Sequence, residues 1–275
     1  MAMSRQDRID AVDEEMFRTL LPESARADLA AWWSANREQY RDGPGAHSIR
    51  YAPARWSSVS PWPVLLADRS RTGDAYVTRA EVVRSVEDAL AREAWREALV
   101  ATFVWGKGKS GSPKGAGPSV LAEEILQSPV LDEALTSAVT ELRTSGPVAA
   151  YELLDRASVK QLGPAFFTKF LYFVDQAAAE TTGVRALILD RNIAGVLRAR
   201  ASAVGRELGL DPDESLAVRA WGDQRSGRWT SHRYGVYLAW MEAANRQLAV
   251  AGPGWPAWAG PDLLELALFG KAWQP

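Results

Sequence analysis

Apolar residues recur at helical spacing along most of this 275-residue chain, and this periodicity restricts the fold more than any other feature. The pattern is clearest in residues 24–40, 78–105, 131–146 and 231–250. The sustained alternation of apolar and polar residues that predicts strands does not occur. Residues 41–77 are rich in Gly, Pro, Ser and aromatic residues, which indicates an irregular connection. The chain is therefore predicted to be all-α.

Local signals place several helix starts. Thr78 followed by Glu81 forms the pattern of a capping box, and Ser24 is a candidate N-cap for the helix that follows it. Pro147 suits the first turn of a helix, and Asp211 suits the cap of a short one. We expect two packed helical lobes: residues 1–150, which include a basic Gly/Lys/Ser loop, and residues 151–275.

Composition excludes several classes of chemistry. The chain has no cysteine, so disulfides, thiolate zinc sites and thiol nucleophiles are excluded. Its two histidines, His47 and His232, lie far apart in the sequence, so we expect no metal site. The charged N-terminus has no signal-peptide pattern, and no apolar window is long enough to cross a bilayer. A cytoplasmic protein is expected.

Basic residues are concentrated in two places, although the net charge is only −2. Residues 105–118 contain Lys107, Lys109 and Lys114 without an acidic residue, and residues 191–246 contain nine arginines against six acids. Local patches of this kind are sufficient for contact with nucleic-acid phosphates. The lysine segment is either a basic flap over DNA or a solvated connector.

The segment 158–173, SVKQLGPAFFTKFLYF, places Gly163 and Pro164 between two helical runs. Glycine can adopt positive φ without strain, and proline is well tolerated in the first turn of a helix. Such a turn leaves backbone N–H groups unpaired at a helix N-terminus, where an anion such as a DNA phosphate binds well. The alternative is an ordinary helix–turn–helix connection within the core.

The segment 186–194, ALILDRNIA, places Asp190 between an apolar run and a helix that begins at Arg191. An aspartate in this position is ordinarily an N-cap. Because the apolar run is expected to be buried, the carboxylate would be partly desolvated and rigidly held.

Three blocks together resemble a known family: FVWGKGK at 103–109, LGPAFFTKFLYF at 162–173 and LILDRNIA at 187–194. They are similar to the bacterial 8-oxoguanine DNA glycosylase-like proteins, within the helix-hairpin-helix superfamily of base-excision glycosylases. The resemblance implies a two-lobed helical helix-hairpin-helix fold with an active cleft between the lobes. It also implies a monomer acting on double-stranded DNA, without a cofactor other than a monovalent cation that some members hold at the hairpin.

The resemblance assigns roles to individual residues. Asp190 takes the position of the essential aspartate, which would stabilise positive charge on the sugar and orient a water molecule. Ala165 stands where bifunctional members have a nucleophilic lysine, so the resemblance implies a monofunctional enzyme. Lys169, one helical turn further along, is either a substitute for that lysine or a solvated helix residue.

The remaining expected roles concern DNA and the excised base. A flipped-out base usually lies between aromatic faces, although aromatic residues at helical spacing are more often part of the core. The candidates for the base pocket are Trp105, Phe166, Phe167 and Trp229. The candidates for DNA contact, besides the three lysines, are Gln161, Leu162, Gly163, Pro164, Arg191, Asn192 and His232.

Two other functions remain open from the sequence. The chain could be a catalytically inactive DNA-binding protein of the same fold, or a helical scaffold that binds proteins through tryptophan-rich surfaces. If it is a glycosylase, its substrate is 8-oxoguanine by resemblance or a hypermodified phage base, and the second would give it a role in antiphage defence.

Overall fold

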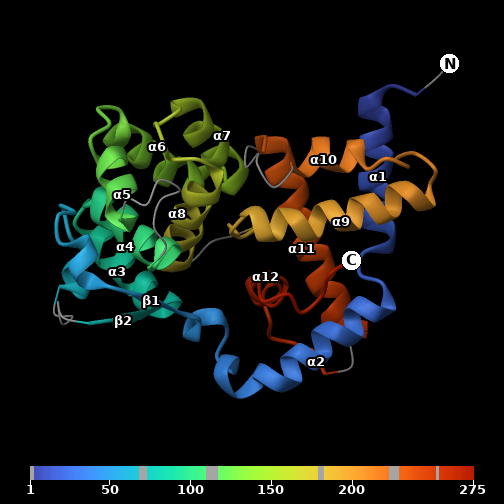
Figure 1. The fold of residues 1–275 in the computed structure, drawn as a ribbon, viewed down its shortest axis with the longest axis horizontal. Helices are drawn as coiled ribbons and strands as arrows, with labels where there is room; N and C mark the ends of the chain where they lie inside the picture. Colours follow the sequence, from blue (N-terminus) through green and yellow to red (C-terminus); the bar gives the residue numbers. More distant parts are fainter. Residues whose placement is uncertain (1–2, 68–72, 110–116, 179–182, 223–228, 252–253) are drawn as a thin grey trace. The chain divides into compact units, whose positions relative to one another are not determined.

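The computed structural model describes residues 3–67, 73–109, 117–178, 183–222, 229–251 and 254–275. Twelve α-helices and one two-stranded sheet are present in these ranges (Figure 1). The predicted all-α class is confirmed. None of the helices in the described ranges is both long enough and apolar enough to cross a membrane.

The chain forms two compact units that are not continuous in sequence. The first contains Met1–Gly43 and Leu189–Pro275, and the second contains Pro44–Ile188. The division expected near residue 150 falls instead inside the second unit, within α7 (Pro147–Ala157). Because α7 packs against α6 (Leu131–Thr144) in that unit, the chain is not divided at this point.

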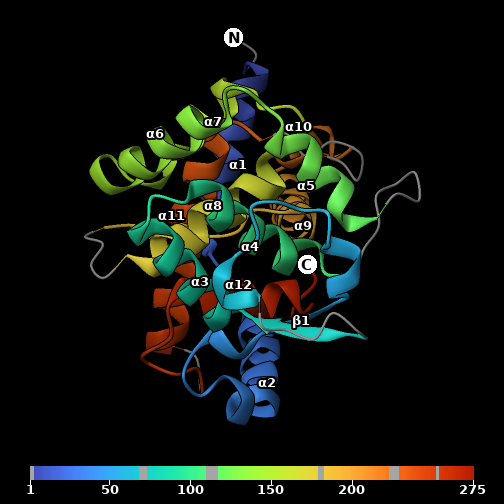
Figure 2. The ribbon, with the colours of Figure 1, turned by 90° about the vertical axis from the view of Figure 1, so that its left-hand side faces the viewer.

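The second unit is built around α8 (Pro164–Ala177), which packs against α3 (Arg79–Ala91), α4 (Trp95–Lys107), α6 and α7 (Figures 1 and 2). Every residue from 167 to 175 is buried. A helix that is apolar on all its faces is expected at the centre of a core. The helix that follows the predicted hairpin is therefore supported from several sides.

The segment 41–77 is more regular than the sequence indicated. It contains three short 3₁₀ turns, η1 (Pro44–Ala46), η2 (Pro53–Trp56) and η3 (Val64–Leu66). Strand β1 (Ser48–Tyr51) pairs antiparallel with β2 (Ala75–Thr78). Strands of four residues are too short to show an alternating pattern, and β1 is positioned by contact with α4.

The helical run 78–105 is divided into two helices. The capping box of Thr78 and Glu81 is confirmed at the start of α3. The helix ends before Arg92, Glu93 has a positive φ of 55°, and α4 begins at Trp95. The break allows α3 and α4 to pack against each other, and a continuous helix would not.

The first unit combines N-terminal and C-terminal helices. These are α1 (Arg5–Thr19), α2 (Glu23–Tyr40), α9 (Arg191–Glu207), α10 (Ser215–Trp221), α11 (Ser231–Ala251) and α12 (Pro261–Phe269). Helix α1 contacts α9, α10 and α11. The buried side chains of Asp13 and Arg233 form an ion pair between α1 and α11, with Asp13 Oδ2 2.6 Å from Arg233 Nη1.

Pro22, rather than Ser24, occupies the N-cap of α2. Glu214 occupies the N-cap position of α10 without a side-chain hydrogen bond, but the carboxylate of Asp211 accepts hydrogen bonds from two backbone N–H groups of this helix, so its predicted capping role is confirmed in part.

The second unit also contains α5 (Pro118–Leu126), which packs against α4 and η2. It follows residues 110–116, which lie outside the described ranges. The position of Lys114 is therefore not described.

Candidate functional site

The turn between α7 and α8 differs in detail from the one expected. Ser158 and Gln161 carry the positive φ angles, 48° and 71°, whereas Gly163 has φ −85°. The turn is closed by a hydrogen bond of 3.0 Å from the Leu162 N–H to the Val159 carbonyl. The expectation that Gly163 provides positive φ is therefore wrong, because the reversal of the chain is completed before this residue.

Gly163 nevertheless faces open space. A Cβ atom added there would meet no heavy atom within 4 Å, so neither backbone conformation nor internal packing requires glycine. Three other helices also begin with Gly-Pro, but Gly146 has φ 90°, and a Cβ on Gly117 or Gly260 would lie 3.7 or 2.8 Å from a neighbouring side-chain oxygen. The space beyond Gly163 is available to an external group.

The first backbone N–H groups of α8 are unpaired. Pro164 has no N–H, and in the described ranges the N–H groups of Gly163 and Ala165 donate no hydrogen bond. Neither residue is buried. The helix dipole adds partial positive charge at this end of a 14-residue helix, so the turn has the properties of an anion-binding site.

Lys169 is buried, so the expectation of a solvated lysine is wrong. Its side chain is 8% exposed, and its Nζ donates a 2.7 Å hydrogen bond to the carbonyl of Ala165. A Cβ on Gly106 of α4 would lie 3.0 Å from Lys169 Cδ, so this glycine makes room for the side chain. Side chains of a helix point back toward its N-terminus, and here the amine reaches the level of Ala165.

The end of α4 also contacts the start of α8. The Phe166 ring stacks on Phe103 with centroids 4.7 Å apart and an interplanar angle of 10°. The Lys107 Nζ lies 5.4 Å from the centroid of the half-buried Phe166 ring, within the range of a cation–π contact. Gly108 has φ 53°, and a Cβ there would lie 2.6 Å from Ile49 Cγ2. The first residues of the lysine segment are therefore packed against β1.

Lys109 has an acidic partner that the local sequence does not reveal. Its Nζ lies 2.6 Å from Asp74 Oδ2, and Arg50 Nε lies 3.4 Å from the same oxygen. The hydrogen bond from Lys109 lowers the pKa of the Asp74 carboxyl, with the charge of Arg50 acting in the same direction. Part of the positive charge of Lys109 is thus balanced within the protein.

Asp190 is the N-cap of α9, as expected from the sequence. Its Oδ1 accepts hydrogen bonds from the N–H groups of Asn192 at 2.9 Å and Ile193 at 3.2 Å. The apolar run before it, residues 186–189, is fully buried, and Asp190 itself is half-buried. The carboxylate is fixed in orientation, while Arg191 and Asn192 are exposed beside it.

A buried aspartate that the sequence analysis did not single out fixes the start of this apolar run. Asp175, near the end of α8, is 2% exposed and accepts a 2.9 Å hydrogen bond from the Ala186 N–H. Arg185 Nε lies 3.0 Å from the same carboxylate, and Arg185 Nη2 donates to the Asp175 carbonyl. An acidic residue within the apolar sequence FLYFVDQ was the available signal for this contact.

The aromatic candidates differ in accessibility. Trp105, Phe167 and Trp229 are buried, and Phe166 is half-buried. Trp105 packs edge-on against His47 and Phe173, and Phe167 packs edge-on against Tyr151.

Burial, with a smaller contribution from Arg79, lowers the pKa of His47 to about 4.

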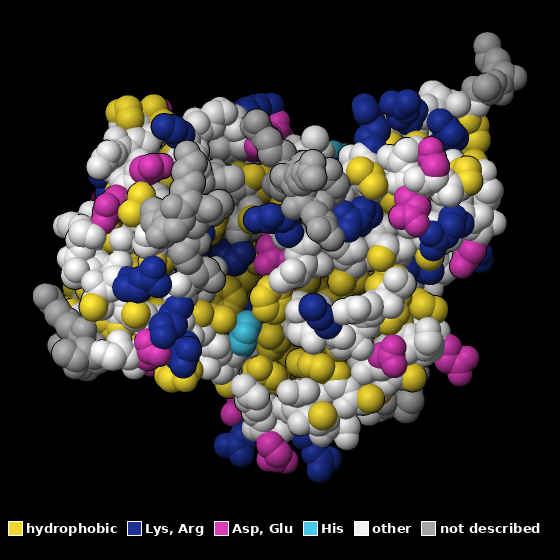
Figure 3. Space-filling view, in the orientation of Figure 1, with side chains coloured by type: hydrophobic (Ala, Val, Ile, Leu, Met, Phe, Trp, Pro, Cys, Tyr) yellow, Lys and Arg dark blue, Asp and Glu magenta, His cyan; other side chains and the backbone are white. Residues whose placement is uncertain are grey.

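Charges of both signs occur on the surface. On the face in Figure 3, Lys and Arg side chains are interspersed with Asp and Glu. His232, near the start of α11, is exposed. No group of three or more potential metal-ligating side chains occurs in the part of the chain that is described.

Comparison with protein families supplies the classification. The model of the family described as "Putative 8-oxoguanine DNA glycosylase OGG-like protein" matches residues 42–269, most of the chain. The chain belongs to this family. The OGG-like match includes the hairpin, Lys169 and Asp190, whereas α1 and α2 precede it. Comparisons with curated proteins and with solved structures gave no match.

Proposed function

We propose that this OGG-like protein is a DNA glycosylase that cleaves the N-glycosidic bond of a damaged or modified base in double-stranded DNA. The observation that carries the proposal is the Asp190 carboxylate, fixed by two backbone N–H groups at the end of a buried apolar run. Family membership supports the same activity.

In this proposal, the hairpin residues 161–164 bind the DNA backbone. The unpaired N–H groups of Gly163 and Ala165 would donate to a phosphate, and the open space beyond Gly163 would allow it to approach. Lys107, Lys109 and Lys114 would add electrostatic attraction, with Lys109 weakened by Asp74. Exposed side chains near the starts of α9 and α11 would extend the contact, namely Arg191, Asn192 and His232.

A monovalent cation would fit the same turn. In the described ranges, the carbonyl oxygens of Gln161 and Leu162 accept no hydrogen bond, so they are available as ligands. Such an ion would add positive charge close to the bound phosphate.

Asp190 would act on the sugar. Departure of the base leaves positive charge on the deoxyribose, and a carboxylate held in one orientation stabilises that charge and orients a water molecule toward C1′. Pre-orientation is effective because the group does not have to reorganise as the charge develops. The base must first be flipped out of the duplex. Phe166, the least buried of the four aromatic candidates, offers the most accessible ring for stacking.

Ala165 favours a monofunctional glycosylase that leaves an intact abasic site. The buried amine of Lys169 favours a second possibility, a combined glycosylase and lyase, because it reaches the level of Ala165. In that reaction the neutral amine attacks C1′, the base departs, and the nitrogen loses a proton. The C1′–O4′ bond then opens to give an imine, which borohydride can reduce to a stable protein–DNA adduct.

The substrate is the least constrained part of the proposal. Family membership points to 8-oxoguanine, and a hypermodified base of phage DNA in the cytoplasm would correspond to a defence function. A protein of this fold that binds DNA without catalysis is the alternative function.

Abasic-site counting tests the proposal. Wild-type protein is incubated with undamaged DNA, 8-oxoguanine DNA and phage DNA that carries modified cytosines, with and without borohydride. We expect abasic sites in one modified substrate and no covalent adduct. A trapped adduct that is lost in Lys169→Met would favour the lyase. No release from any substrate, despite DNA binding, would leave the binding protein as the better account.

A further inference from the structure

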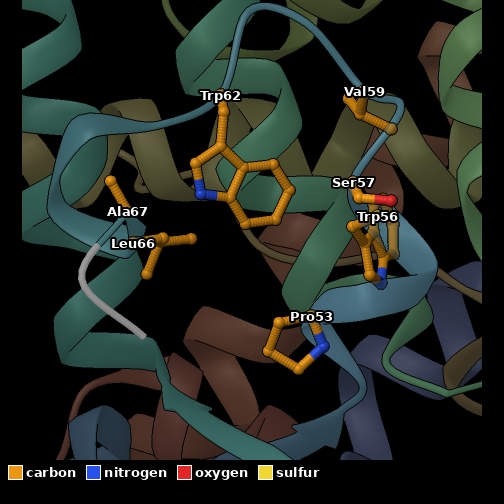
Figure 4. Close-up of a pocket in the computed structure, with 7 residues that line it drawn as sticks. All are labelled: Pro53, Trp56, Ser57, Val59, Trp62, Leu66 and Ala67. Carbon is orange, nitrogen blue, oxygen red and sulfur yellow. The ribbon is translucent and has the colours of Figure 1, made fainter. Parts of the chain in front are cut away.

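One pocket lies entirely within the second unit, between η2 and η3 (Figure 4). Its volume is about 110 Å³, and the side chains that line it are hydrophobic except for that of Ser57. Trp62 and Leu66 approach it from one side and Trp56 from the other, as the close-up shows. None of the roles proposed above uses these residues.

Two tryptophans define the shape of this pocket. The indole rings of Trp56 and Trp62 have centroids 6.5 Å apart and are inclined at 52°. Trp62 is half-buried, which leaves part of its ring accessible, whereas Trp56 is 1% exposed. A flat aromatic ring can stack on one indole and present its edge to the other.

Trp56 also has an unused hydrogen-bond donor. Its Nε1 is buried and has no acceptor among the described residues. A buried donor without an acceptor is costly, so a ligand with an acceptor atom on its edge would relieve this cost. An aliphatic side chain would fill the pocket but would leave the N–H unpaired.

The volume favours a single ring. Pockets for drug-sized ligands usually measure about 300–1,000 Å³, whereas an engineered cavity of about 150 Å³ binds benzene. At about 110 Å³, this pocket is closer in size to the benzene-binding cavity than to a pocket for a drug-sized ligand. A planar single ring with acceptors on its edge is the chemistry of a pyrimidine base.

The pocket is adjacent to the proposed phosphate-binding segment. Arg55 of η2 donates a 3.2 Å hydrogen bond to the carbonyl of Lys109. On the far side of residues 110–116, α5 packs against η2, and Ser58 donates to Glu123 of α5. The wall that carries Trp56 therefore contacts both ends of the lysine segment, so phosphate and base of one strand can be bound together.

We propose that the Trp56–Trp62 pocket binds one unpaired pyrimidine base of a DNA strand, stacked on the accessible indole of Trp62 with its edge toward Trp56, and accepting a hydrogen bond from Trp56 Nε1. The inference rests on the proposed function only in that the protein binds DNA. It involves no covalent step and does not depend on which base is excised.

Binding of short fluorescent oligonucleotides to the full-length protein tests the proposal. The probes are an oligothymidylate and the same backbone without bases, and the variants are Trp62→Ala, Trp56→Phe and Ala67→Leu. Ala67→Leu fills the pocket from its exposed rim and avoids the loss of a core side chain. Trp258→Ala, an exposed tryptophan of the first unit, is the control.

Trp62→Ala removes one stacking surface and should weaken oligothymidylate binding by roughly 5- to 150-fold, as expected for base–aromatic stacking. Ala67→Leu should have a similar effect, Trp56→Phe a smaller one, and Trp258→Ala none. The slope of log K against log salt should not change, because no phosphate contact is removed. Binding of the base-free backbone should be equally weak in all proteins.

Unchanged oligothymidylate affinity in both Trp62→Ala and Ala67→Leu would overturn the inference, as would equal losses for the two probes. These results do not depend on the proposed function, because base release by the wild type is measured separately. If the wild type releases a base but these variants bind oligothymidylate normally, only the pocket proposal fails.

Discussion

The N-termini of α8 and α9 are built in opposite ways. Helix α8 begins at Gly163 and Pro164 without a side-chain cap, and its first N–H groups are unpaired in the described ranges. Helix α9 begins at Asp190, whose carboxylate accepts hydrogen bonds from two N–H groups of the first turn. An uncapped helix start can bind an external anion, whereas a capped one holds its own anion in a fixed orientation. We infer that the first binds DNA and that the second performs the chemistry.

The largest effect on stability is expected at the contact that ties the end of α8 to the segment leading to α9. Asp175→Ala leaves the buried N–H of Ala186 without an acceptor and removes the ion-pair partner of Arg185. The expected loss in the free energy of unfolding is roughly 3 kcal/mol, measured by denaturant titration. Glu87→Ala, which replaces an exposed acidic residue of α3 outside this contact, should change it far less. Similar losses in both variants would show that Asp175 has no special role.

The difference between the two helix starts can be removed by giving α8 the kind of cap that α9 has. Gly163→Asp would place a carboxylate where the phosphate is proposed to bind, and Gly163→Asn is its uncharged control. DNA affinity should fall by about 2 kcal/mol, roughly 30-fold, while stability changes by only a few tenths of a kcal/mol. Affinity would be measured by fluorescence anisotropy and stability by thermal unfolding. An unchanged affinity for Gly163→Asp would remove the hairpin from the DNA interface.

A smaller effect is expected on the salt dependence of DNA binding, and it should differ between Lys107 and Lys109, the two lysines of this segment that the structure describes. If Lys107 contacts a phosphate, Lys107→Ala should reduce the slope of log K against log salt by about one. Lys109→Ala should reduce it less, because Asp74 already balances part of that charge. Lys271→Gln, in the first unit, is the control. Equal slopes in all three variants would indicate that this segment is a solvated connector.

The sequence predicted the features that depend on neighbouring residues. In the capping box of Thr78 and Glu81 and in the aspartate cap of α9, each side chain binds backbone within three positions of itself. The proline at the start of α7 acts through its own backbone conformation. Such local contacts give the same pattern in many folds, so they can be recognised without tertiary information.

The features that were missed depend on residues that are distant in sequence. Lys169 looked like a solvated residue because the sequence does not show that Gly106 makes room for its side chain. The lysine segment looked free of acids because Asp74 lies 35 positions before Lys109. The first unit unites residues 1–43 with residues 189–275, so no division at a single point could describe it.

The central claim is that Asp190 stabilises positive charge on the sugar, and base release by Asp190→Asn in a single turnover tests it most directly. The substitution preserves size and can still accept the two capping hydrogen bonds through its amide oxygen. With protein in excess over a substrate that the wild type cleaves, the release rate should fall by about 10²–10³-fold, as for other losses of a single electrostatic stabiliser. DNA affinity should remain at the wild-type level or increase. Equal release rates for wild type and Asp190→Asn at saturating protein would contradict the account.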